Sequence, residues 1–429
     1  MRRRSIALLI VCFFPLSGAL WAQFEQYTSP GGPRERRLAS KESLERKIEE
    51  SRFRLGRLSL DPWIGIRDAA YTRQYTSTGE REPADFTVTV GAGLTAYLHT
   101  GSKVIWTAEA IPEYVWWAEQ ADRRRVNGRY GLTVNAFFNR MTATLAADRT
   151  ADQRIVTPDL LEPVSASTRT ARFDTEVDLS RALFAYGGLA VVEQENLVDE
   201  IDDPLTQSLA LLDRDEQVSR FGLGWRSPGG LAVRVGAERS QVDFLRPVLD
   251  RSNEGTAPTL AVDLDRRRFA FHVDLAARSL TAQEGARFVD YDEVTGAASF
   301  SMRLGRRIEP RLYGFHTLAY TLSEEYAYLD DERIGFSLRF DTGAANSVAT
   351  FFVESGTQSY APLSATAADR KDDHFAYGTS LTVRLRKSLT VALQATRIEI
   401  ESNVPGADRG YTVVGTSINL LTAGSAGGE

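Results

Sequence analysis

A set of charged side chains occupies every second position of several extended stretches, on the face opposite the apolar residues. Charges that line a pore select which ions or solutes pass. Opposite charges on neighbouring strands also pair and brace a protein interior. Both interpretations stay open from the sequence. The predicted lumen-lining residues are Glu109, Glu113, Arg172, Asp174, Glu176, Asp178, Arg234, Glu238, Arg268, His272, Asp274, Arg339 and Arg384.

Catalytic motifs are missing from the sequence. It contains no Gly-x-Ser-x-Gly turn, no phosphate-binding loop and no His-Glu-x-x-His pair. The histidines are widely separated, and none has a second histidine at ligand spacing; they are His99, His272, His316 and His374. Because a serine site cannot be inferred from scattered residues, we predict no catalytic residues, no cofactor and no enzymatic activity.

Acidic residues gather in three runs, at positions 199–203, 213–216 and 330–332. Carboxylate oxygens suit calcium or magnesium, but these runs lack the spacing of a known calcium loop. We therefore predict solvated external loops there, and no metal site.

The first 22 residues have the organisation of a secretory signal peptide. Arg2 to Arg4 form the positive region, residues 6–16 form a short apolar run, and small residues lead to cleavage after Ala22. Cys12 is the one cysteine, so the mature chain is expected to have no disulfide. The formal net charge is -6, and loss of the leading arginines makes the mature chain more acidic, which argues against a nucleic-acid partner.

No stretch beyond the signal is long enough for a membrane helix; the longest apolar run is 183–192. The other structure that lipid admits is a closed β-barrel, because closure pairs every backbone group. The hydrophobic fraction of 43% suits a barrel, in which half of each strand faces water.

Alternation with a period of two begins at Leu58 and is clearest from Asp85 to Thr100. There, apolar residues at even positions alternate with small or polar residues, which places one set on each face of a strand. The stretch exceeds the roughly 9–11 residues that a tilted strand needs to cross a bilayer. The pattern recurs at 171–180, 268–275, 334–341 and 374–385. A two-sheet sandwich also alternates, but it would not need so many long strands.

Short turns alternate with long polar connections, as expected for the two rims of an outer-membrane barrel. The long connections are expected at 120–128, 154–167, 199–215, 244–258, 323–331, 362–373 and 402–409. A change of phase between Leu264 and Phe269 predicts one turn near Asp265. We predict an all-β, antiparallel up-and-down transmembrane barrel over residues 58–421, with about eighteen strands and sixteen as the alternative.

Residues 23–57 are predicted to form a polar periplasmic segment with a short helix from Ser40 to Arg54. Leu44 and Ile48 make its thin apolar stripe. We expect a solvated extension, and a helix that docks on a periplasmic partner is the alternative. Residues 422–429 are expected to form a small polar tail.

Residues 55–62 (LGRLSLDP) resemble the first strand of outer-membrane barrels of the "porin 2" type. The stretches 85–87, 101–103, 113–116 and 299–307 also fit, so the resemblance covers residues 55–421. It implies a barrel of the kind often associated with exopolysaccharide secretion. Two features depart from the family: residues 71–74 (YTRQ) stand where it usually has Tyr-Asp-Asp-Asn after the first strand, and a small polar tail replaces the C-terminal aromatic that the barrel-assembly machinery reads.

The first hypothesis is therefore a porin-like channel in the cell outer membrane for small or oligosaccharide solutes. The second is a structural or surface-binding barrel, plugged by residues 23–57 or by loops and associated with polysaccharide export. The third is a barrel hydrolase. Expected partners are outer-membrane lipid, the barrel-assembly machinery and, from the resemblance, polysaccharide. The sequence does not determine the oligomeric state.

Overall fold

The computed structural model describes residues 40–76, 85–154, 156–159, 164–196, 209–246, 249–343, 347–386 and 389–421. The predicted signal peptide, residues 23–39 and the C-terminal tail lie outside these ranges. Within them, no helix is both long and apolar enough to cross a membrane. The helix α1 (Lys41–Glu50) and the short 3-10 turn η1 (Ala121–Arg123) accompany a single antiparallel sheet in the described part of the chain.

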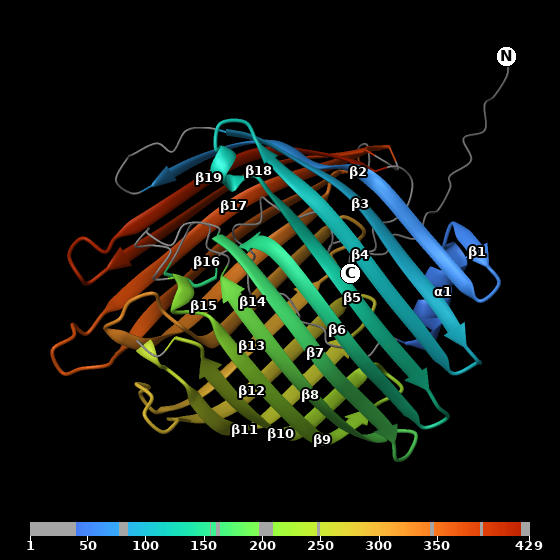
Figure 1. Ribbon diagram of the computed structural model, residues 1–429, viewed down its shortest axis with the longest axis horizontal. Coiled ribbons are helices and arrows are strands. Elements are labelled where there is room, and N and C mark those ends of the chain that lie inside the picture. The colour runs from blue at the N-terminus through green and yellow to red at the C-terminus, as the bar shows by residue number, and fades with distance from the viewer. Residues whose placement is uncertain are drawn as a thin grey trace.

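The sheet consists of long strands that follow one another around the molecule (Figure 1). A three-residue strand, β1 (Phe53–Leu55), forms a hairpin with the start of the first long strand. The long strands are β2 (Leu58–Thr76), β3 (Asp85–Thr100), β4 (Val104–Trp117), β5 (Arg125–Phe137), β6 (Met141–Arg154), β7 (Val164–Asp178), β8 (Leu183–Asn196), β9 (Arg214–Arg226), β10 (Leu231–Phe244), β11 (Asn253–Asp265), β12 (Phe269–Ala282), β13 (Tyr291–Met302), β14 (Ile308–Ala319), β15 (Tyr326–Asp341), β16 (Ser347–Pro362), β17 (Lys371–Arg386), β18 (Leu389–Ser402) and β19 (Arg409–Leu421).

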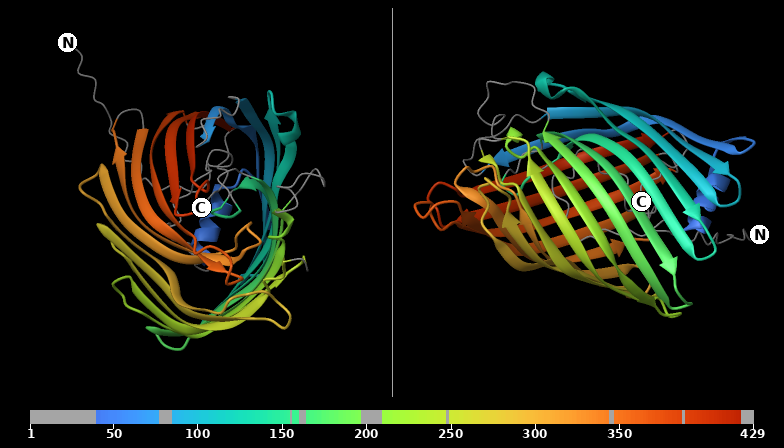
Figure 2. Two further views of the ribbon diagram at one scale, coloured as in Figure 1. Left: turned by 90° about the vertical axis from the view of Figure 1, so that its left-hand side faces the viewer. Right: turned by 60° about the horizontal axis from the view of Figure 1, so that its bottom comes forward.

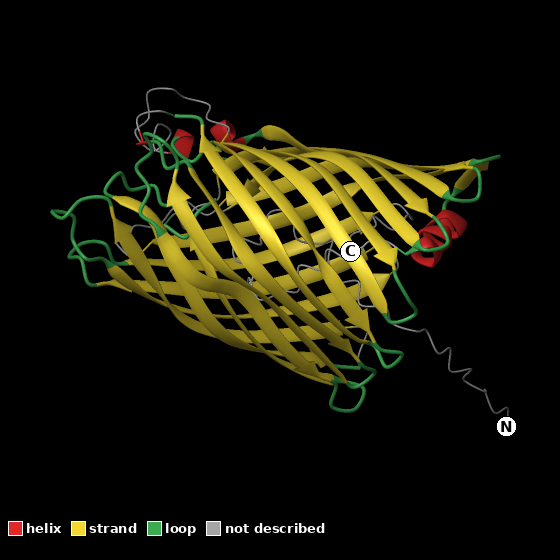
Figure 3. Cartoon of the chain, turned by 90° about the horizontal axis from the view of Figure 1, so that it is seen from below, coloured by secondary structure: helices red, strands yellow, loops and turns green. Residues whose placement is uncertain are grey.

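The sheet closes on itself because β19 pairs with β2, with Thr416 opposite Tyr71 and Leu420 opposite Ile66. Every other long strand pairs with its neighbours in sequence, which gives a closed barrel of 18 strands. Figure 3 shows the strands tilted around the barrel, with the longest helix at one end and short helical turns at the other. The predicted fold class is confirmed, and the barrel has eighteen strands and not the alternative of sixteen.

The two faces of the wall differ as the alternation predicted. In β3, Phe86, Val90 and Leu94 point outward and are exposed, whereas Thr87 and Thr89 point into the barrel and are buried. The same arrangement holds around the ring, so large apolar side chains form an exposed outer belt. An apolar surface of this extent is unfavourable in water, and it is the surface that a barrel presents to lipid.

The sequence analysis predicted several strands too short at their long-loop ends. β5 already begins at Arg125, β11 at Asn253 and β15 at Tyr326, inside the predicted connections. In these extensions, residues 326–329 of β15 are consecutive buried Tyr, Ala, Tyr and Leu, and residues 253–256 of β11 are small or polar. Period-two alternation of apolar and polar residues therefore disappears while the hydrogen-bonded ladder continues. The predicted turn after Asp265 is confirmed, because β11 ends at that residue.

Helix α1 lies at the short-turn end of the barrel, where Figure 2 shows it inside the outline of the opening. Its first turn is capped by Ser40, whose Oγ accepts a hydrogen bond from Ser43 N at 3.1 Å. Leu44 and Ile48 are buried against inward-facing residues of the wall, namely Tyr97, Ile105 and Phe137. The expectation of a solvated extension is wrong for this helix. Its apolar stripe is covered by its own barrel, so that stripe is not free for a periplasmic partner.

Leu393 and Gln394 are adjacent in β18 but face opposite sides of the wall, and Leu393 is exposed on the outer belt. We predict that Leu393→Arg lowers the free energy of unfolding in phospholipid vesicles by about 2–4 kcal/mol, because it places a charge in lipid. Gln394→Arg should cost much less, because that position faces the interior. Urea unfolding followed by heat-modifiable gel mobility measures both. Equal losses of unfolding free energy in the two variants would contradict the assignment of Leu393 to the outer face and Gln394 to the inner face.

Candidate functional site

Ion pairs join alternate strands along the inner wall between β7 and β12. Asp174 of β7 accepts a hydrogen bond from Arg220 of β9 at 2.6 Å, although β8 lies between them. The residue between them in register is Gly188. A Cβ atom at Gly188 would lie 2.6 Å from Asp174 Oδ1. The missing side chain therefore leaves the space in which the two charges meet.

A second bridge of this kind lies closer to the short-turn rim. Arg226 Nη2 donates to Glu176 at 2.5 Å and to Asp178 at 3.1 Å. The guanidinium also lies 4.2 Å from the centroid of the Phe184 ring in the intervening strand. A cation placed over an aromatic face is attracted to it, so one arginine is held by two acids and a ring.

Ion pairs continue on β10 to β12, where some join neighbouring strands. Asp263 pairs with Arg234 at 2.5 Å and with His272 Nδ1 at 2.6 Å. Glu238 pairs with Arg278 at 2.9 Å. The sequence left open whether these charges line a pore or pair with one another. In this part of the wall, most of them pair.

The remaining predicted residues differ in their surroundings. Glu109 pairs with Arg129 at 2.7 Å, and Glu113 is buried beside Gly91. Asp274 of β12 faces the interior of the barrel. Arg268 lies in the turn before β12, at the short-turn rim and not along the wall as predicted.

Three predicted arginines form no ion pair within the described ranges: Arg172, Arg339 and Arg384. Arg339 and Arg384 lie near the short-turn ends of β15 and β17, separated by β16. Arg339 stands opposite Glu309 across the β14–β15 ladder, and Arg384 stands opposite Thr390.

The connection from β6 to β7 reaches across the mouth of the barrel on the long-loop side. Eight strands separate β6 from β15 in either direction around the ring, so they lie on opposite walls. Thr157 nevertheless donates from Oγ1 to the carbonyl of Tyr320 at 2.7 Å. Asp159 accepts from the backbone N–H of Leu322 at 3.1 Å and from the hydroxyl of Tyr360. Residues 156–159 therefore narrow the opening.

Charged residues surround this crossing. Arg409 contacts Asp372 at 2.9 Å and lies 3.9 Å from Asp159. Arg251 is completely buried and donates to the carbonyls of Thr321 and Ser323 at 2.6 and 2.5 Å. Burial lowers the pKa of Arg251 to about 10, which leaves it charged at neutral pH. The loops from three parts of the chain are thus held together by buried polar contacts.

The sequence analysis missed the partners in these pairs. In residues 214–226, Arg220 and Arg226 occupy even positions, whereas Phe221, Leu223 and Trp225 occupy odd ones. This alternation already indicates that the two arginines face the interior. Nothing in the sequence marks Asp159, because its contacts come from residues more than 160 positions away.

The histidines lie on different strands, and one belongs to a cluster of potential metal ligands. Single ligand atoms of His316, Asp330 and Glu332 lie within 4.8 Å of one another on the outer face. His316 Nε2 is 2.6 Å from Asp330, which the ion pair alone explains. Asp331, from the same predicted acidic run, faces inward and pairs with Arg333 at 2.6 Å. The run is therefore divided between the two faces. The run at 199–203 lies outside the described residues.

Comparison with known proteins identifies the fold. No family model matches the chain, and no curated protein matches it. Solved structures of outer-membrane porins from Pseudomonas aeruginosa do match. OccK2 (OpdF), solved with glucuronate, has 11% identity and a TM-score of 0.52 over 85% of this chain and 98% of its own. OccK3 (OpdO) has 13% identity and a TM-score of 0.51 over 89% and 98%.

A third structure, OpdK with vanillate, has 10% identity and a TM-score of 0.50 over 85% of this chain and 99% of its own. These neighbours are channels and not enzymes, which is the class that the sequence analysis predicted. At such low identity the likeness shows the fold: this chain has the barrel fold of outer-membrane porins.

Arg251 offers a test of the loop contacts. We predict that Arg251→Met leaves two buried carbonyls without a donor, at a local cost of about 1–3 kcal/mol. Hydrogen exchange at residues 321–323 should accelerate, while exchange in the middle of the strands stays unchanged. Arg303→Gln, at an exposed pair with Glu309, is the control and should alter neither. Unchanged exchange at 321–323 in the Met variant would contradict the loop arrangement.

Proposed function

We propose that this chain is an outer-membrane channel for small polar or oligosaccharide solutes. The observation that carries the proposal is the crossing of the mouth by residues 156–159, from β6 to the opposite wall. A loop that narrows a charged opening selects solutes, whereas a barrel that only anchors or displays a surface has no need of one. The apolar outer belt and charged inner wall support the same function.

Arg339 and Arg384 favour solutes that carry a negative charge. Both lie on the inner wall and form no ion pair among the described residues. A carboxylate moving past them would gain an attraction that the braced arginines of β9 and β10 do not offer. Glucuronate, present in the OccK2 structure, is a sugar acid and therefore a suitable probe.

The plugged barrel is the second candidate, and helix α1 is the observation that favours it. The helix packs on the inner wall at the short-turn opening through Leu44 and Ile48. A connection with exopolysaccharide export rests on the sequence resemblance and stays a prediction, as do the barrel-assembly machinery and polysaccharide as partners.

Single-channel recording in planar bilayers tests the channel. We predict discrete conductance steps for the purified, heat-modifiable protein. Thr157→Val combined with Asp159→Ala should raise the conductance, because the loop loses its contacts on the opposite wall. Leu44→Ser combined with Ile48→Ser removes the apolar contacts of α1. If wild type is silent and only this second double variant conducts, the plugged barrel replaces the open channel.

Reversal potentials in a gradient of sodium glucuronate test the anion preference. Two charges 4 Å apart in water attract by about 1 kcal/mol, which corresponds to a roughly fivefold change. Arg339→Gln with Arg384→Gln should therefore lower the permeability of glucuronate relative to sodium by roughly that factor. The control is Arg239→Gln, whose exposed side chain lies on the outer face of β10 and pairs with Glu254. An unchanged permeability ratio in the double variant would contradict the proposed anion preference but not the proposed channel.

A further inference from the structure

The short turns of the barrel carry charge of one sign. Every charged residue in the described turns at this end is a cation, and every one is exposed. These residues are Arg57, Lys103, Arg140, Arg181, Arg266, Arg267, Arg268, Arg303, Arg306 and Arg307. The whole chain has a formal net charge of -6, so its composition does not account for such a rim. Described connections at the other end mix both signs, as in residues 118–124.

Six of these cations gather on two neighbouring turns, one between β11 and β12 and the other between β13 and β14. We call them the arginine patch; they are Arg266, Arg267, Arg268, Arg303, Arg306 and Arg307. The turns meet because β12 pairs with β13, and Arg303 N donates to the carbonyl of Arg268 at 2.7 Å. These two residues therefore stand opposite each other, and like charges in that position repel.

Two guanidinium groups spread the patch over the adjacent turns. A Cβ atom added at Gly343, in the turn after β15, would lie 3.0 Å from Arg307 Nη2. A Cβ atom added at Gly229, in the turn after β9, would overlap Arg266 Nη2. The two glycines leave the room in which these arginines lie along the rim. The patch therefore reaches four consecutive short turns, from β9–β10 to β15–β16.

The acids near the patch do not balance it. Glu309 is the partner of Arg303, at 3.3 Å. Asp265 and Asp341 end the adjoining strands, and Asp341 accepts a hydrogen bond from the backbone N–H of Gly343 at 2.9 Å. The other arginines of the patch form no ion pair within the described residues. Six arginines against three acids leave three positive charges unmatched.

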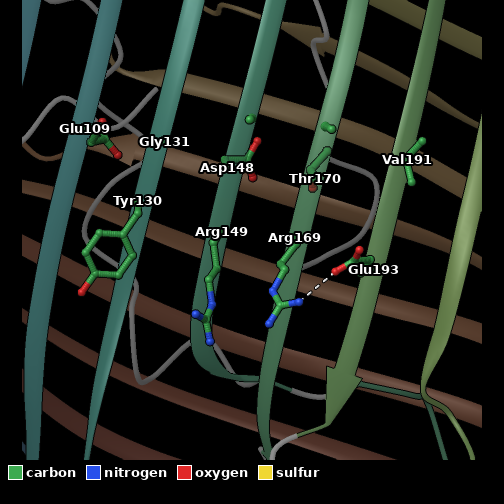
Figure 4. Close-up of a pocket in the computed structure, with 11 residues that line it drawn as sticks. Glu109, Tyr130, Gly131, Asp148, Arg149, Arg169, Thr170, Val191 and Glu193 are labelled. Carbon is green, nitrogen blue, oxygen red and sulfur yellow. Dashed lines mark hydrogen bonds and ion pairs between the residues drawn. The ribbon is translucent and has the colours of Figure 1, made fainter.

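Arginines elsewhere on the surface stand among acids. Figure 4 shows Arg169, on the outer face of β7, beside Glu193 at 3.0 Å. Glu195 lies 3.8 Å from the same arginine, and Glu109 and Asp148 belong to the same lining. The carboxylates of that group match its arginines, so it offers little to an anion. The arginine patch differs because its cations outnumber the acids around them.

We propose that the arginine patch binds an acidic peptide segment of a protein in the periplasm. Short turns of outer-membrane barrels face that compartment. Arginine presents paired N–H donors to a carboxylate, and it is enriched in protein interfaces. Leu304 stands between Arg303 and Arg306 in the sequence and is 46% exposed. An exposed apolar side chain among arginines suits a peptide better than a hydroxylated glycan.

The patch lies on a part of the rim that α1 leaves free. The helix packs against Tyr97, Ile105 and Phe137, which belong to β3, β4 and β5. The strands that carry the patch, β11 to β14, are at least six strands away in either direction around the ring. An acidic segment therefore reaches the arginines without displacing the helix. This inference rests on the placement of the barrel in an outer membrane, but not on conduction.

Fluorescence anisotropy with the full barrel in nanodiscs of zwitterionic lipid tests the patch. The probe is a dye-labelled peptide of glutamates with one central leucine. The same peptide with glutamine in place of glutamate and an oligogalacturonate are the comparison probes. We expect wild type to bind the glutamate peptide most tightly of the three. Its affinity should fall as salt rises, because salt screens exposed charges.

The combined substitutions Arg266→Gln, Arg267→Gln and Arg306→Gln remove half of the patch while leaving the strands untouched. Affinity for the glutamate peptide should fall roughly tenfold, through loss of three exposed ion pairs with the probe. Affinity for the glutamine peptide should stay unchanged, because that probe carries no carboxylates along its length.

Other turns of the same rim provide a matched control. Lys103→Gln, Arg140→Gln and Arg181→Gln together remove the same number of exposed cations, but each of these stands alone in its turn. Affinity for the glutamate peptide should stay within about twofold of wild type, since attraction beyond about 8 Å is largely screened at physiological ionic strength.

Glu309→Gln provides a test in the opposite direction. It removes the carboxylate that pairs with Arg303, so affinity for the glutamate peptide should rise, by about twofold. A turn that was merely disturbed would not bind more tightly. This variant keeps the proposal open to contradiction even if the triple arginine variant does not fold.

Three results would overturn the proposal: equal binding of the glutamine peptide, equal loss of affinity in the control triple variant, or tighter binding of the oligogalacturonate. The first would show that carboxylates are not recognised, and the second that the whole rim attracts anions without a site. The third would make an acidic glycan the ligand. Conductance steps recorded with the same variants separate these outcomes from the channel proposal, because a conducting barrel that ignores the acidic peptide contradicts only the peptide site.

Discussion

The pairing of β19 with β2 is the contact on which the rest of the structure depends. A sheet edge left open in lipid would expose backbone N–H and C=O groups with no water to satisfy them. Closure removes both edges and also divides the residues of every strand between an inside and an outside. The apolar belt, the charged inner wall and the mouth all follow from that division.

Closure also places charges inside a wall whose neighbouring strands leave little room. The structure accommodates them by letting arginines reach across a strand to acids two strands away, as Arg220 does to Asp174. At this bridge the missing side chain of Gly188 leaves the space in which the two charges meet, whereas Arg226 reaches Glu176 over the ring of Phe184. Braced pairs hold the wall, and Arg339 and Arg384 stand outside such pairs. The sequence alone could not separate the two groups.

The two ends of the barrel differ for a related reason. At the short-turn end, tight connections leave room for α1 to pack on the inner wall. At the other end, long connections meet one another, and Asp159 and Arg251 fix them through buried polar contacts. Burying a charge of this kind is costly unless the charged group is hydrogen-bonded. Contacts between loops from distant parts of the chain therefore set the size of the opening.

Alternation in the sequence was enough to predict the barrel, the strand number and the inward or outward direction of residues such as Phe86 and Thr87, because a pleated strand sends successive side chains to opposite faces. It failed at the long-loop ends of strands, where the alternation is lost, at Arg268, which lies in a turn, and at helix α1, whose apolar stripe packs on the barrel. Which charges pair, and what Asp159 touches, was decided by the tertiary structure. Closing the ring brings together residues that lie far apart in the chain, and no local pattern records their distance.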